Sequence, residues 1–128
     1  MSQKTVLIIE DEEDAADMFA EMMRVSGYRV LKTSSSTPAL SMMAAEKPDV
    51  VILDIMMPEI SGLDILRQMR KNPELVQTPV VVVSAKSMPA DIKLGMEAGA
   101  SIYLTKPVGF VELKEAIERA VGRSSTSS

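Results

Sequence analysis

The sequence predicts a three-layer α/β sandwich in which a five-stranded parallel sheet is flanked by five helices. Nearly continuous apolar runs suit strands that are covered on both faces, and three such runs are present: Val6–Ile9, Val50–Leu53 and Val80–Val83. Segments with apolar residues at helical spacing separate these runs. Right-handed crossovers between parallel strands then place helices on both faces of the sheet.

The first apolar strand leads into a helix expected at Asp14–Ser26, which Gly27 ends. Tyr28–Thr33 is a weaker strand candidate. Thr37-Pro38 has the pattern of an N-cap followed by a first-turn proline, which predicts a helix over residues 37–47. The first helix has one apolar face, made of Ala15, Phe19, Met22 and Met23.

The strand Val50–Leu53 precedes a helix expected at Ser61–Lys71, which Asn72-Pro73 ends. The strand Val80–Val83 precedes a helix expected at Pro89–Ala98, with Gly99 as its C-terminal stop. The pattern of strand, helix, strand therefore continues without interruption.

Ser101–Thr105 is the fifth strand candidate, and Gly109–Val121 is the clearest helix. We expect one domain over residues 1–121, followed by a flexible serine-rich tail or the start of a linker at 122–128. The stripe of the last helix consists of Phe110, Leu113, Ala116, Ile117, Ala120 and Val121.

The composition excludes several kinds of chemistry and of binding partner. The chain has 128 residues, a net charge of -4, no cysteine and no histidine, so thiol and imidazole chemistry are excluded. The acidic balance argues against direct nucleic-acid binding. No apolar stretch is long enough for a membrane span and no signal peptide is evident, so we expect a cytoplasmic protein without membrane contact.

Polar side chains end the predicted strands. Glu10 and Asp11 follow the first strand, Asp54 the third, Ser84 the fourth and Lys106 the fifth. Carboxyl ends of parallel strands share one edge of a sheet, where ligands bind in such folds. Clustered carboxylates call for a hard cation such as Mg²⁺. Together with a lysine and a hydroxyl they suit phosphoryl transfer with Asp54 as nucleophile.

Each of these residues also has an ordinary structural interpretation. Glu10–Asp14 resembles a solvated acidic turn before a helix, Asp54 a strand cap, and Lys106 a surface loop residue. Their occurrence in order at successive strand ends favours a shared site.

With these residues in view, the chain resembles the response-regulator receiver domain of two-component systems, single-domain chemotaxis regulators included, over residues 4–121. The resemblance implies a flavodoxin-like (βα)5 fold with strand order 2-1-3-4-5. Departures such as Glu10 for the commoner aspartate leave the phosphoacceptor chemistry intact. The motifs are the acidic pair Glu10-Asp11, Asp54 with Met56-Met57-Pro58 and Gly62, Ser84-Ala85, Gly99-Ala100 and Lys106-Pro107.

The resemblance implies that Asp54 is the phosphoacceptor. Asp11, Asp54 and the Met56 carbonyl would bind Mg²⁺ directly, with Glu10 acting through water. Such a domain catalyses only its own phosphorylation and dephosphorylation and is otherwise no enzyme.

The resemblance also implies that Ser84 and Lys106 hold phosphoryl oxygens and that Ser84 and Tyr103 form the switch. The Lys106-Pro107 bond is expected to be cis, with Pro107 as the cis-proline. The donor would be a sensor histidine kinase or phosphotransfer protein. A downstream output domain or partner would bind the face of the fourth helix, fifth strand and fifth helix, on a monomer or a phosphorylation-promoted dimer.

Two alternatives stand beside this hypothesis. An aspartyl-phosphate phosphohydrolase would want a second Asp two residues after the nucleophile, where this chain has Met56. A degenerate receiver would act as a phosphorylation-independent docking module, against which intact Asp54, Ser84 and Lys106 argue. Gly95 in the fourth helix either weakens that helix, making it mobile, or allows close packing against a neighbour.

Overall fold

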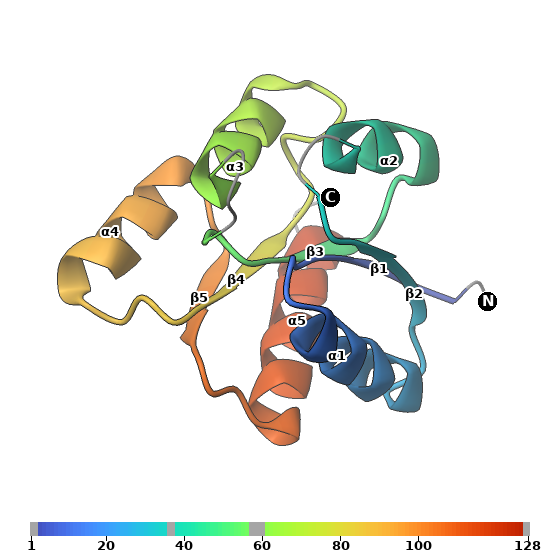
Figure 1. The fold of residues 1–128 in the computed structure, drawn as a ribbon. Helices are drawn as coiled ribbons and strands as arrows, with labels where there is room; N and C mark the ends of the chain where they lie inside the picture. The colour runs from blue at the N-terminus through green and yellow to red at the C-terminus, as the bar shows by residue number, and fades with distance from the viewer. Residues whose placement is uncertain (1–2, 36–37, 57–60, 127–128) are drawn as a thin grey trace.

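A computed structural model describes residues 3–35, 38–56 and 61–126, which form alternating strands and helices (Figure 1). All the predicted strands and helices are present, and most ends differ by only one or two residues. The strands are β1 (Thr5–Ile9), β2 (Arg29–Thr33), β3 (Val50–Leu53), β4 (Val80–Ser84) and β5 (Ile102–Thr105). The helices are α1 (Glu13–Val25), α2 (Ala39–Glu46), α3 (Gly62–Lys71), α4 (Pro89–Ala98) and α5 (Phe110–Thr126).

The described strands form one parallel sheet in the order β2-β1-β3-β4-β5, which confirms the predicted flavodoxin-like topology. The register aligns the strand ends. Ile9 of β1 pairs with Leu53 of β3, and Ser84 of β4 pairs with Thr105 of β5. The residues after these pairs therefore leave the sheet at the same edge.

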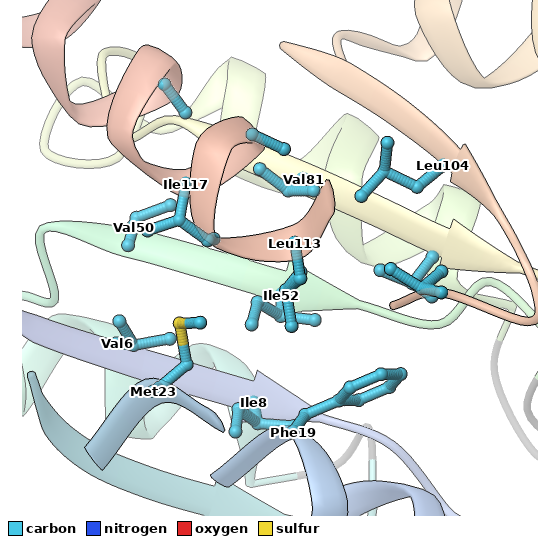
Figure 2. Packing of buried hydrophobic residues seen from close by; sticks show 14 of the residues in the cluster. Val6, Ile8, Phe19, Met23, Val50, Ile52, Val81, Leu104, Leu113 and Ile117 are labelled. Atoms are coloured by element: carbon cyan, nitrogen blue, oxygen red, sulfur yellow. The ribbon is translucent and has the colours of Figure 1, made fainter. Parts of the chain in front are cut away.

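Alternate side chains of the central strands enter two separate cores, one on each face of the sheet. On one face, Val6, Ile8 and Ile52 pack against α1 and α5, and Figure 2 shows Phe19, Met23, Leu113 and Ile117 in this layer. On the other face, α2, α3 and α4 cover the sheet (Figure 1). Burial on both faces explains why the central strands are apolar without alternation.

Three details differ from the sequence expectation. Helix α5 continues to Thr126, beyond its expected end at Val121 and into the serine-rich segment. Phe110, the first residue of α5, stays 38% exposed although it belongs to the predicted apolar stripe. Pro38 occupies the N-cap position of α2, whereas Thr37, the expected N-cap, lies outside the described residues.

Within the described part of the chain, none of the helices combines the length and the apolar character that crossing a bilayer requires.

Candidate functional site

The sheet itself brings Glu10 and Asp54 together. Asp54 follows β3 and donates its backbone N–H to the carbonyl of Ile9, at 3.0 Å, which extends the β1–β3 ladder by one residue. Glu10 follows Ile9 directly. Both carboxylates are withdrawn from solvent, with exposures of 1% for Glu10 and 6% for Asp54. A buried carboxylate requires a counter-charge or strong hydrogen bonds, so their partners define the site.

Lys106 supplies that counter-charge. Its Nζ lies 2.7 Å from Glu10 Oε1 and 3.2 Å from Asp54 Oδ2. Lys106 follows the last residue of β5. Its backbone N–H donates to the carbonyl of Ser84, the last residue of β4, at 2.9 Å, so the neighbouring strand positions the lysine. The peptide bond from Lys106 to Pro107 is cis, as the resemblance implied.

The ionisable side chains at this site shift one another's pKa values. Burial, together with the hydrogen bond and negative charge of Asp54, raises the pKa of Glu10 to about 7, although Lys106 opposes the rise. Burial would lower the pKa of Lys106, but the hydrogen bond with Glu10 and the negative charges of Glu10 and Asp54 outweigh it and raise that pKa. The lysine therefore stays protonated between the two carboxylates.

Glu10, Asp11 and Asp54 are the residues that would hold a cation. One carboxylate oxygen from each lies within 4.8 Å of the others, and Asp11 is exposed at the open side of the group. The donors are all oxygen, which suits Mg²⁺. Three carboxylates face one ammonium group, so the ionised cluster keeps a negative charge that a divalent cation would balance.

The segment after β3 shapes the Asp54 carboxylate. The backbone N–H of Met56 donates to Asp54 Oδ1 at 2.8 Å, while the Met56 side chain is 47% exposed. The start of α3 packs closely behind this segment, since a Cβ on Gly62 would lie 2.5 Å from the Cα of Ile55 and 2.6 Å from the carbonyl oxygen of Asp54. Glycine at position 62 is thus required by the close approach of the two backbones.

Ser84 and Tyr103 both bond to the backbone of Lys86. Ser84 is fully buried, and its Oγ accepts a hydrogen bond from the N–H of Lys86 at 3.1 Å. The Tyr103 hydroxyl donates to the carbonyl oxygen of the same Lys86 at 2.8 Å. The β4–α4 loop therefore connects the serine at the site to the tyrosine on β5.

An open cleft of about 570 Å³ adjoins the carboxylates. Asp11 and Met56 line it on the side of the acidic group, and Lys86, Asp91 and Leu94 line it on the side of α4. The acidic group is therefore open to a molecule that enters this cleft.

The structure thus brings Glu10, Asp11, Asp54 and Lys106 into one group, as the sequence predicted. Sequence reasoning did not foresee that Lys106 contacts Glu10 more closely than Asp54, nor that Lys86 joins Ser84 to Tyr103. The link through Lys86 uses only its backbone, so its side-chain identity carried no signal. The Met56 carbonyl and the water-mediated role of Glu10 stay predictions.

Comparison with known proteins identifies the family of the chain. Residues 6–118 match the response regulator receiver domain family. The chain is 32% identical over 119 residues to the polar-differentiation response regulator DivK of Brucella ovis, covering 93% of this chain and 97% of that protein.

Solved structures show the same likeness. A response regulator receiver domain protein from Clostridium thermocellum superposes with a TM-score of 0.89 at 32% identity, covering 98% of this chain and 99% of the other. A CheY-like receiver domain protein from Methanospirillum hungatei reaches a TM-score of 0.92 over 99% of this chain and 100% of its own; at 22% identity it supports the fold alone.

Proposed function

Because the chain belongs to the response regulator receiver domain family, we propose that Asp54 accepts a phosphoryl group in the presence of Mg²⁺. The donor is a histidine kinase or phosphotransfer protein, and phosphorylation switches the binding of a partner. The observation that carries this proposal is the Lys106 ammonium group, which lies between the buried carboxylates of Glu10 and Asp54. We further propose that the protein works in the cytoplasm and catalyses only its own phosphorylation and dephosphorylation.

The chemistry follows from the contacts of Asp54. One carboxylate oxygen attacks phosphorus while the bond from phosphorus to the leaving group of the donor breaks, and the leaving group keeps the electron pair. Mg²⁺ held by Asp11 and Asp54 would neutralise charge on the phosphoryl oxygens. The N–H of Met56 keeps the carboxylate oriented through its bond to Oδ1. Lys106 lies close enough to Asp54 Oδ2 to contact a phosphoryl oxygen attached there.

Ser84 and Tyr103 suggest how the event reaches the surface. A phosphoryl group adds nearly two negative charges and new acceptor oxygens. Ser84 can turn its hydroxyl to donate to one of them, which weakens its bond from the Lys86 N–H. Because the Lys86 carbonyl also holds Tyr103, movement of this loop releases or redirects the tyrosine. The face formed by α4, β5 and α5 then changes for a partner.

The test uses Mg²⁺ and a small phosphodonor such as acetyl phosphate, followed by mapping of the modified residue. We expect one acid-stable, base-labile phosphoryl group on Asp54, lost in Asp54→Asn and kept in Asp64→Asn, a substitution on the exposed face of α3. In Asp11→Ala the dependence on Mg²⁺ should disappear, because a ligand has been removed.

Stoichiometric labelling of Asp54→Asn would refute the proposal. If the protein takes up no label and a partner binds wild type and Asp54→Asn equally, a phosphorylation-independent docking module is the better assignment.

A further inference from the structure

Gly95, in the middle of α4, lies directly against the ring of Tyr103. A Cβ built on Gly95 would lie 2.7 Å from Cδ2 and 2.8 Å from Cε2 of that ring. Carbon atoms in favourable contact are separated by about 3.5–4.0 Å. With any other residue at position 95, the ring and the helix cannot both keep their present places.

The backbone of Gly95 gives no other reason for a glycine. Within the described residues its φ is not among the positive values, which are those of Lys47, Gly27 and Gly99. Glycine inside a helix destabilises it relative to alanine. Gly122, inside α5, shows the contrast, because a Cβ there would meet no atom within 4 Å. Space for the tyrosine ring is therefore the feature that sets Gly95 apart.

The ring joins two elements that the proposed switch must move together. Its hydroxyl is bonded to the Lys86 carbonyl in the β4–α4 loop, while its edge lies against the middle of α4. Helix α4 buries few of its own residues, which are only Gly95 and Ala98 among those described. The contact with Tyr103 thus involves one of the two buried residues by which α4 meets the rest of the fold.

We propose that Gly95 is a positioning residue that couples the conformation of Tyr103 to the placement of α4. When the edge of the ring lies against the helix, its hydroxyl reaches Lys86. When the ring leaves, α4 loses the contact and becomes free to shift. The regulatory part of this proposal rests on the proposed function, in which phosphorylation of Asp54 acts through Ser84 and the β4–α4 loop.

The direct test replaces Gly95 by alanine and follows the tyrosine rings by NMR with ¹³C-labelled tyrosine. The chain has only two tyrosines, so Tyr28 serves as an internal reference. Tyr28 packs in the core layer formed with α1 and α5, on the other side of the sheet. We expect the Tyr103 signals of Gly95→Ala to shift and those of Tyr28 to stay within the spectral resolution.

Measurements of stability keep the test decisive even if Gly95→Ala folds poorly. Gly122→Ala is the matched control and should raise the urea midpoint, as alanine does in a helix without a clash. Gly95→Ala should lower the midpoint in the wild-type background but raise it when Tyr103 is also alanine, because the clash is then gone. A midpoint that rises in both backgrounds, with unchanged Tyr103 signals, would overturn the proposal.

A phosphoryl mimic separates this proposal from the proposed function. With Mg²⁺ and beryllofluoride, the Tyr103 signals of wild type should shift and amide exchange in residues 89–98 should change. In Gly95→Ala the added shift should be at least twofold smaller, because the ring has already left the helix. An equal response in both proteins refutes the coupling. If beryllofluoride binds but leaves wild-type Tyr103 unchanged, the switch mechanism fails and the coupling has no regulatory role.

Discussion

Arg70, in the last turn of α3, connects three separate segments, and its removal gives the sharpest test of how this fold is held together. Its Nε and Nη2 donate to the carbonyl of Gly99 at 3.0 and 2.8 Å. Its Nη1 donates to the carbonyls of Leu75, Val76 and Thr78 at 3.3, 3.1 and 2.7 Å. The side chain thus ties the C-terminal end of α4 to the loop between α3 and β4.

Replacing Arg70 by methionine keeps most of the aliphatic stem and removes the donors. Hydrogen bonds that involve a charged group contribute about 1.5–3 kcal/mol each. These bonds share one half-buried guanidinium, and the loop carbonyls can be hydrated after its loss, so their contributions do not add. The carbonyl of Gly99 is the main group left without its donors, at a cost of about 1–3 kcal/mol. We expect Arg70→Met to lower the free energy of unfolding by about 2–3 kcal/mol, out of a typical 5–15 kcal/mol.

Urea unfolding followed by circular dichroism measures this loss. Arg67→Met is the matched control on the same helix, because Arg67 is exposed and its 3.4 Å ion pair with Asp64 should contribute less than about 0.5 kcal/mol. Amide exchange adds a local test: the N–H groups of Ala100 and Ser101, which donate to Gly95 and Val80, should exchange faster in Arg70→Met. A stability within about 0.5 kcal/mol of the Arg67→Met protein, with unchanged exchange at these amides, would refute the reasoning.

Further predictions concern the acidic site and α4. Since the pKa of Glu10 is about 7, the folded protein keeps a proton on this side chain that the unfolded chain releases above pH 4.5. Without Mg²⁺, the free energy of unfolding should therefore fall as pH rises from about 4.5 to 7. Urea titrations of Glu10→Gln should not show this dependence on pH. Ionisation of Glu10 adds negative charge beside the other carboxylates, so Mg²⁺ affinity measured by calorimetry should rise over the same interval, and a pH-independent affinity would contradict this. Met56 and Lys86 beside the site offer no carboxamide or carboxylate that could orient a water molecule, so phosphorylated Asp54 should be long-lived. Met56→Asn should shorten the lifetime of the phosphoryl group. An unchanged decay of the label in this variant would argue against the idea. Backbone amides of residues 91–94 in α4 should exchange faster than those of residues 113–120 in α5. The reason is that, among the described residues of α4, none before Gly95 is buried. Equal protection in the two segments would show that α4 is as firmly held as α5.

Local patterns in the sequence were sufficient for the fold class and for the position of the site. Val50–Leu53 and Val80–Val83 are apolar at every position, which suits strands that are covered on both faces. Once the strands are parallel, Glu10, Asp54 and Lys106 must leave the sheet at the same edge, so spacing along the chain predicts proximity in space. The carboxylate group and the counter-charge of Lys106 could therefore be anticipated before any coordinates.

For Gly95, in contrast, the sequence left two interpretations open. Its sequence context allowed a helix weakened by glycine as well as a helix packed closely on a neighbour. The structure supports close packing, since the Tyr103 ring occupies the space of the missing side chain. The mobility of α4 stays a prediction to be measured.

The periodicity of the sequence by itself determined the layers, the parallel sheet and the acidic edge, while the order of the strands followed from the resemblance to a known family. Tertiary structure alone decided which atoms meet, such as Lys106 with Glu10, Arg70 with the carbonyl of Gly99 twenty-nine residues away, and Tyr103 with Gly95. The physical reason is that hydrophobic patterning acts through repeats of two or 3.6 residues along the chain, whereas these contacts depend on side-chain conformations and on the distance between packed elements. No local pattern records those quantities.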